Sequence, residues 1–330
     1  MVSISIVIAA HDQGSELQRN LPLLLAQDFK PGFEVIVVDE SSTDETEEVL
    51  KQLRAEHPNL YTTFIPASSH YVSRRKLAIT LGIKAAKGKW VILTEADCHP
   101  ENPAWLQTMY QEMTDANDVV LGFTSYSPDT KSSRRFVRLI HWRRQQLRPY
   151  CYDGANIAIR KQAFMERNGF LKNLSHLRGE FDFLVNETDP DRIALCNSPE
   201  ARVCQEDPTN RLWDAHQLFY MDTRRHLRRT FVPRLLFTIS QTAIHLSYWL
   251  ILGALAVAAI LQNSLIAAIA GGLLIVMLAW RTFRTWSITK SYGEQFALWR
   301  LPLLDLGIAW HYVTYWLRYR CADKKDFERT

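Results

Sequence analysis

Acidic side chains follow three strand-like apolar runs in the first third of this 330-residue chain. Asp12 and Asp39 come at or just after two of the runs, and Glu95 and Asp97 come directly after the third. Because the carboxyl ends of parallel strands meet at one edge of a sheet, we expect these side chains to lie together. Neighbouring carboxylates are ligands of hard divalent cations that also bind substrate phosphates. The pattern predicts a Mg²⁺ or Mn²⁺ site for a phosphate-bearing substrate; the alternative is that Glu95 and Asp97 only cap a helix expected at 102–113.

A second pair of acids, Glu180 and Asp182, lies much further along the chain. A carboxylate within hydrogen-bond reach of a hydroxyl group can accept its proton as the oxygen attacks. The pair is therefore a candidate general base. The alternative is that both acids only form ion pairs with Arg178 or Arg192.

Basic residues are distributed unevenly in a chain whose net charge is only +4. Arginines crowd 134–148 and 224–234, next to apolar sequence, which indicates contact with phosphates or anionic lipid headgroups. No nucleic-acid-binding module accompanies them, so nucleic acid is not an expected partner. Arg224 and Arg225 are a candidate diphosphate clamp, because a guanidinium fork fits phosphate oxygens. Equally, they could be the positive flank of a membrane span.

Alternating strand and helix patterns position these residues. Apolar, β-branched runs predict strands at 4–9, 34–39, 62–65 and 90–94. Helical patterns lie between them, at 16–27, 44–56 and 76–86. This alternation predicts an α/β domain with a Rossmann-like, mostly parallel sheet.

The composition changes after residue 230. Residues 235–260 contain no Asp, Glu, Lys or Arg, and 264–280 form a second uncharged stretch after a three-residue turn. Both are candidate membrane spans, and the arginines on either side place both flanks in the cytoplasm. A third apolar segment, 296–317, is interrupted by polar residues and is expected to be interfacial or re-entrant. The alternative for 235–280 is a buried hairpin of a soluble protein.

Five segments resemble the motifs of the family-two glycosyltransferases, which have the GT-A fold. In chain order they are Ser3–Gln13, Glu34–Thr46, Trp90–Asp97, Asp153–Arg160 and Arg178–Leu184. The resemblance covers about residues 3–230 and depends on all five motifs in this order. It implies a catalytic domain over 1–230, followed by a helical membrane anchor over 231–330.

The resemblance also implies roles for individual residues. Those placed on the nucleotide-sugar are His11, Asp12, Asp39, Lys76 and Glu95, with Arg74 and Arg75 as equal alternatives to Lys76. Asp97 and Glu95 would hold Mg²⁺ or Mn²⁺, although the motif here is E-x-D and not D-x-D. Asp182 is the expected catalytic base and Glu180 the close second, because Phe181 stands where the family carries its acid.

The expected function is therefore inverting transfer of a sugar from a UDP- or GDP-linked donor at the cytoplasmic face of the cell membrane, beside membrane lipids. The acceptor would be a glycan or a lipid-linked saccharide, because the multi-pass anchor holds the site near lipid. One alternative is a polyprenyl-phosphate sugar synthase, whose phosphate acceptor needs no base. An alternative of another class is a non-catalytic nucleotide-binding scaffold in an envelope-glycan complex.

Overall fold

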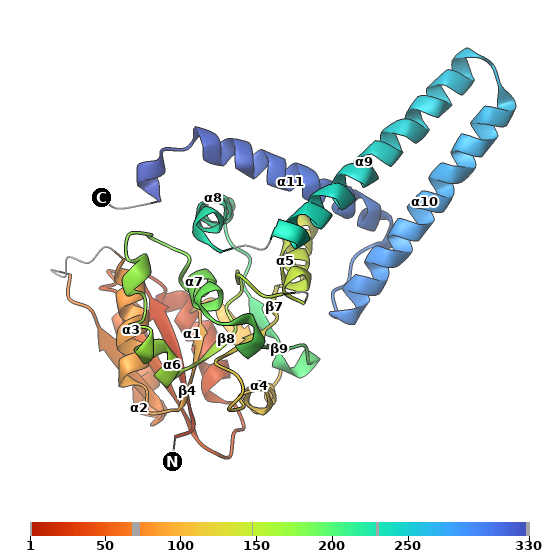
Figure 1. Ribbon diagram of the computed structural model, residues 1–330. Helices are drawn as coiled ribbons and strands as arrows, with labels where there is room; N and C mark the ends of the chain where they lie inside the picture. The colour runs from red at the N-terminus through yellow and green to blue at the C-terminus, as the bar shows by residue number, and fades with distance from the viewer. Residues whose placement is uncertain (1, 68–72, 147, 229–230, 328–330) are drawn as a thin grey trace. The chain divides into compact units, whose positions relative to one another are not determined.

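The chain folds into two compact units in a computed structural model, which describes residues 2–67, 73–146, 148–228 and 231–327, without the side chains of 231–234 (Figure 1). The described residues of Met1–Leu227 and Arg318–Thr330 form the first unit, and Arg228–Leu317 form the second. Residues 318–327, expected from the sequence to belong to the anchor, thus lie in the same unit as the sheet.

A seven-stranded sheet is the centre of the first unit, with the strand order β3-β2-β1-β4-β8-β6-β9. Only β8 runs against the other strands, since it pairs antiparallel with both β4 and β6. The strands are β1 (Ile4–Ala10), β2 (Phe33–Asp39), β3 (Leu60–Phe64), β4 (Trp90–Thr94), β6 (Val119–Gly122), β8 (Ile157–Arg160) and β9 (Ile193–Cys196). The predicted α/β fold with a mostly parallel sheet is confirmed.

A small second sheet lies beyond β4 in the sequence. It has the order β5-β10-β7, with β5 at Cys98–Pro100, β7 at Thr124–Tyr126 and β10 at Val203–Gln205. Strand β10 pairs antiparallel with β5 and parallel with β7. This pairing brings Gln205 opposite Cys98, next to the acids that follow β4.

Helices connect the strands of the first unit (Figure 1). They are α1 (Gly14–Leu25), α2 (Thr46–Glu56), α3 (Arg74–Ala85), α4 (Trp105–Gln111), α5 (Ser132–Gln145), α6 (Lys161–Glu166), α7 (Glu180–Glu187) and α8 (Asn210–His226), with short 3₁₀ turns at Leu171–Asn173, Pro190–Arg192, Pro199–Ala201 and Lys324–Asp326. The elements expected from the sequence are present with ends shifted by a few residues, as is usual where helix ends fray.

The core explains why β1 and α3 form where they do. All seven residues of β1 are buried, as expected of a strand covered on both faces. Helix α3 begins after Ser73, whose hydroxyl accepts a hydrogen bond from Lys76 N, and it packs on β1 and β2. The contact is close at Gly82, where a Cβ atom would lie 2.4 Å from Val7 Cγ1. Helix α3 is thereby held firmly, with its N-terminal residues near the carboxyl ends of the strands.

The second unit is helical. Helices α9 (Phe231–Ile260) and α10 (Ser264–Ser291) run side by side as a hairpin, followed by a 3₁₀ turn at Leu298–Arg300 and by α11 (Leu301–Cys321) (Figure 1). The residues of α11 from Arg318 onward belong to the first unit. The Asn263 side chain caps α10 by accepting hydrogen bonds from Leu265 N and Ile266 N. Two segments, Leu235–Ile260 and Ser264–Ser291, are long and apolar enough to cross a membrane.

The apolar side chains of this hairpin are largely uncovered. Trp249 is 67% exposed, Ile260 80% and Leu265 68%. Soluble monomers rarely leave so much contiguous apolar surface in contact with water. The second unit therefore agrees with the expected helical hairpin, and α11 is not among the two candidate spans found in the described residues.

Candidate functional site

The loops after β1 and β2 are tied to each other through their acids. Asp12 Oδ1 accepts hydrogen bonds from Thr43 N (2.7 Å) and Thr43 Oγ1 (3.3 Å), and Ser42 Oγ accepts from Asp12 N at 2.9 Å. Asp39 in turn accepts from Ser42 N (3.0 Å) and Ser42 Oγ (2.5 Å). The bond from the Thr43 amide is the main cause that lowers the pKa of Asp12. The structure therefore brings Asp12 and Asp39 together, as the sequence predicts.

The backbone of these loops is held in an unusual conformation. Asp12 has a φ of 50° and Ser41 a φ of 63°, in the left-handed region that residues other than glycine rarely adopt. Such conformations persist where surrounding contacts enforce them, and they are enriched at ligand sites. His11, beside Asp12, is more than half exposed, with its Nε2 3.6 Å from Asp12 Oδ2. The first two strand ends thus present His11 and Asp12 at the surface.

Arg75, at the start of α3, joins acids from distant parts of the chain. Its Nη2 lies 2.5 Å from Glu95 Oε1, and its Nε lies 3.9 Å from Glu180 Oε2. Burial alone would lower the pKa of this guanidinium, but the charges of Glu95, Glu180 and Glu40 raise it. Burial raises the pKa of Glu40, and Arg75 opposes that shift. The acids at the ends of β2 and β4 and at the start of α7 therefore surround one guanidinium group, that of Arg75.

Lys76 is used differently from what the sequence predicts. Its side chain is 1% exposed, and its ammonium group donates to the carbonyl oxygens of Asn173 (2.8 Å) and His176. Burial lowers its pKa to about 8. In this structure Lys76 binds the loop before α7, whereas its neighbour Arg75, an equal alternative in the sequence, points at the acids. Consecutive helical residues point in different directions, so only the packing of α3 decides between them.

Asp97, the expected metal ligand, is oriented by β10. Its Oδ2 accepts from Gln205 Nε2 at 3.0 Å and its Oδ1 from Cys98 Sγ at 3.4 Å. Burial, followed by the charge of Glu95, raises the pKa of Asp97 to about 6. For Glu95, burial is outweighed by Arg75, which lowers the pKa of that carboxyl. Glu95 and Asp97 thus offer neighbouring carboxylate oxygens, with the charge of Glu95 opposing that of Asp97, and such a donor set fits a hard divalent cation.

A buried polar network continues behind Gln205. Arg138 donates from Nη2 to Gln205 Oε1 at 2.9 Å, and from Nη1 to the carbonyl oxygen of Asp153. The Asp153 carboxylate meets His141 Nδ1 at 2.5 Å, and His141 Nε2 meets Tyr220 OH at 2.8 Å. Burial lowers the pKa of His141 to about 3, so the ring is neutral at pH 7 and donates from Nδ1 to Asp153. This network orients the Asp97 carboxylate through Gln205. In the sequence, only the motif that begins at Asp153 indicates that the network exists.

Asp182 and Glu180 are both buried at the start of α7, each 6% exposed. Asp182 Oδ1 accepts from Tyr152 N at 2.9 Å. Burial raises the pKa of Asp182 to about 7, and Arg224 limits the rise. Glu180 Oε1 has no hydrogen-bond partner among the described residues. Buried polar atoms are normally satisfied, so such an oxygen is a place where a ligand hydroxyl or amide group fits.

The two candidate clamp arginines have separate surroundings. Arg224 is 7% exposed and donates to Tyr150 OH (2.8 Å) and to Cys151 Sγ (2.9 Å), with its guanidinium 3.6 Å from the centre of the Tyr220 ring. It faces Asp182 closely enough to affect that pKa. Arg225 is exposed and lies over the ring of Tyr319. The structure thus brings Arg224 to the acids of α7, with two of its nitrogens already bonded, and does not bring Arg225 there.

The chain is similar to known proteins in both its sequence and its fold. The family model described as "Glycosyl transferase family 2" matches residues 5–172, which are 168 of the 330 residues. A search of curated proteins finds no match. Similar solved structures include the mannosyltransferase PcManGT from Pyrobaculum calidifontis in complex with GDP-Man and Mn²⁺ (17% identity, TM-score 0.56, 93% of this chain and 87% of that chain). Another is S. aureus TarS 1-349 in complex with UDP-GlcNAc (17% identity, TM-score 0.48, 66% of this chain and 67% of that chain).

Proposed function

Because this chain belongs to glycosyl transferase family 2 and has the GT-A fold, it is a glycosyltransferase, and we propose that it transfers a sugar, with inversion, from a UDP- or GDP-linked donor to a glycan or lipid-linked saccharide. The observation that carries the proposal is the Arg75 contact. One guanidinium joins Glu95, after β4, to Glu180, at the start of α7. Glu95, assigned to the donor, and Glu180, assigned to the acceptor side, therefore both lie beside the same arginine side chain.

Glu95 and Asp97 are the proposed ligands of Mg²⁺ or Mn²⁺. Such an ion, when bound, neutralises the negative charge that develops on the departing nucleoside diphosphate. Gln205 holds Asp97 in place, and burial, followed by the charge of Glu95, raises the pKa of Asp97 to about 6. The P. calidifontis mannosyltransferase, solved with GDP-Man and Mn²⁺, supports this assignment by analogy of fold.

Asp39, Asp12 and His11 are the proposed contacts to the nucleoside. They lie at the carboxyl ends of β1 and β2, where nucleotides bind in sheets of this kind. Hydrogen bonds between the two loops hold Asp12 and Asp39 before any ligand binds. Preorganised groups of this kind lose little conformational entropy when they bind.

Asp182 is the proposed base. As the acceptor oxygen forms its bond to C1 of the sugar and the C1–O bond to the diphosphate breaks, the hydroxyl proton passes to the Asp182 carboxylate. A base is most effective when its pKa lies near the working pH, and burial raises the pKa of Asp182 to about 7. Glu180 is the second candidate; its unpartnered Oε1 suits a sugar hydroxyl, with Oε2 beside Arg75.

The second unit is the proposed anchor, over 231–317, with the catalytic unit in the cytoplasm. The exposed apolar hairpin of α9 and α10 supports membrane insertion, and arginines on both sides of it support cytoplasmic flanks. An anchor of this kind keeps the site close to lipid-linked acceptors.

A donor screen tests the proposal. Full-length protein in detergent is incubated with UDP- and GDP-sugars and a lipid extract, with and without Mn²⁺, and release of nucleoside diphosphate is measured. Asp97→Asn should abolish release, whereas Asp115→Asn, at a carboxylate that is 86% exposed, should not change it. No release from any donor would contradict the proposal. A lipid-phosphate sugar product that still forms with Asp182→Asn and Glu180→Gln would favour the polyprenyl-phosphate synthase.

A further inference from the structure

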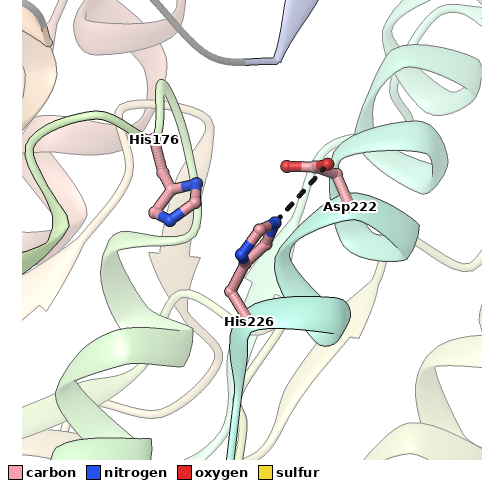
Figure 2. A group of neighbouring side chains, drawn as sticks. All are labelled: His176, Asp222 and His226. Atoms are coloured by element: carbon pink, nitrogen blue, oxygen red, sulfur yellow. Dashed lines mark ion pairs between the residues drawn. The ribbon is translucent and has the colours of Figure 1, made fainter. Parts of the chain in front are cut away.

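Three side chains that the proposed function does not use are gathered at the end of α8. His176, Asp222 and His226 each offer one ligand atom, and these atoms all lie within 4.8 Å of one another. Figure 2 shows the two imidazole rings and the carboxylate turned toward a common centre. Among the described residues, no other group of three His, Cys, Asp or Glu side chains is as close. The cluster contains no ligand assigned to the donor-side metal.

Secondary structure positions all three groups before any ion binds. Asp222 and His226 are four residues apart in the last turn of α8, so they share one face of the helix, with His226 Nε2 4.0 Å from Asp222 Oδ1. His176 lies in the loop before α7, where its carbonyl oxygen accepts from Lys76 and its ring stacks on Phe183, with the ring centres 5.2 Å apart. The centres of the two imidazole rings are 4.3 Å apart.

The C-terminal residues of the first unit brace this cluster. Tyr319 OH donates to Asp222 Oδ1 at 2.8 Å, and Tyr319 is buried. Phe327 packs on the ring of Tyr319, and its carbonyl oxygen accepts from Leu177 N, next to His176. A hydrogen bond that orients a carboxylate from behind is the usual support of a metal ligand. The segment 318–327 thus holds both the carboxylate and the loop that carries His176.

The donor set selects the kind of ion. Two imidazole nitrogens and one carboxylate oxygen suit zinc and similar transition metals, whereas Mg²⁺ takes oxygen ligands. His226 is exposed, which leaves room for water as a fourth ligand. In a tetrahedral site the ligand atoms lie roughly 3.4 Å apart. The ligand atoms, which lie within 4.8 Å of one another, therefore need to approach by up to about 1.4 Å, and rotation about the side-chain bonds of the exposed His226 allows this.

From these observations we infer that His176, Asp222 and His226 bind a zinc-type divalent ion that joins the loop before α7 to the end of α8. The site is separate from Glu95 and Asp97 in its residues and in its preference for nitrogen ligands. It acts on the position of α7, because the bound loop leads directly into that helix through Gly179. Gly179 has a φ of 88° and is pressed against Thr223 of α8. These three residues would bind the ion whichever sugar or acceptor the protein uses.

Zinc titration of the full-length, untagged protein in detergent tests the inference. The protein is stripped with a chelator and titrated with Zn²⁺ against a chromophoric competitor, in excess Mg²⁺, which occupies oxygen-only sites. We expect one tight site, weakened at least about 100-fold by His226→Ala and about 10–100-fold by Tyr319→Phe. His57→Ala, at a histidine after α2, and Asp97→Asn should leave the affinity unchanged. Unchanged affinity in His226→Ala, or an equal loss in Asp97→Asn, overturns the inference.

A second measurement does not rely on variants. Co²⁺ added to the stripped wild-type protein should give the strong visible absorption of a four-coordinate, imidazole-ligated ion, and Zn²⁺ should displace it. The far-ultraviolet circular dichroism of His226→Ala should match that of the wild type, because the side chain is exposed. A weak cobalt spectrum typical of six oxygen ligands, in the wild type, would show that these three residues do not form the site.

Discussion

Asp182→Asn separates catalysis from stability at one buried carboxyl group. The asparagine keeps an oxygen for the Tyr152 amide but cannot take a proton from the acceptor. Burial raises the pKa of Asp182 from 3.8 to about 7, so the folded protein holds this proton at a pH where the unfolded chain has lost it. The folded state then binds more protons than the unfolded state, and its stability falls as the pH rises from about 4 to about 7.

The magnitude follows from the two pKa values. Ionisation of such a group lowers the free energy of unfolding by roughly 2–3 kcal/mol between about pH 5 and about pH 8. Asp182→Asn lacks this loss, so it should become more stable than the wild type by that amount over the same interval. Turnover should fall by about 10²–10⁴-fold, the usual contribution of a general base. In the wild type, kcat/KM should rise with pH through a midpoint near the pKa of about 7.

Urea unfolding and donor turnover, each measured across the pH range, check both parts. Asp118→Asn is unsuitable as a control because three arginines bind that acid, so the matched control is the exposed Asp115→Asn. The control should change neither quantity. Turnover within about tenfold of wild type in Asp182→Asn, together with a kcat/KM that does not vary with pH, would refute the assignment of the base. A loss of turnover in Glu180→Gln alone would move the role to Glu180.

Three further predictions concern the acids, the metal site and the anchor. Arg75→Met should lower the free energy of unfolding by about 3 kcal/mol, measured with urea, because it leaves its acidic neighbours without their shared cation. Gln205→Leu should weaken the apparent Mn²⁺ affinity in the turnover assay by about 10–100-fold, with kcat at saturating Mn²⁺ near wild type, because Asp97 loses its orienting donor. Leu261→Cys, at the tip of the hairpin, should react with a membrane-impermeant maleimide in intact cells, whereas the exposed native Cys321 should react only after permeabilisation.

Each of these predictions has an internal comparison. Arg19→Met removes a more exposed ion pair and should cost less than about 1 kcal/mol, so equal losses would argue against a special role for Arg75. Gln146→Leu removes two exposed side-chain hydrogen bonds to Asn197 and should leave the Mn²⁺ dependence unchanged. Labelling of Cys321 in intact cells would reverse the proposed orientation.

The sequence by itself determined the framework of this protein. Mainly apolar, β-branched runs predicted β1, β2 and β4, because a strand covered on both faces is apolar along most of its length. The acids after those strands were expected at one edge of the sheet, and the parallel register places Asp39 opposite Ala10 and Thr94 opposite Ile8. These features are local in the chain, or follow from a single rule of sheet geometry, so no knowledge of packing was needed.

Only the tertiary structure decided which charged groups meet. Arg75 and Lys76 are neighbours of similar charge, yet one joins acids and the other holds a loop, because the packing of α3 sets the direction of each side chain. His141 meets Tyr220 across 79 residues of chain, and His176 reaches the end of α8 in the same way. The pKa of Asp182 likewise depends on burial by many residues at once. Such contacts and such desolvation arise only when side chains from distant parts of the chain pack together, so the spacing of residues in the sequence does not predict them.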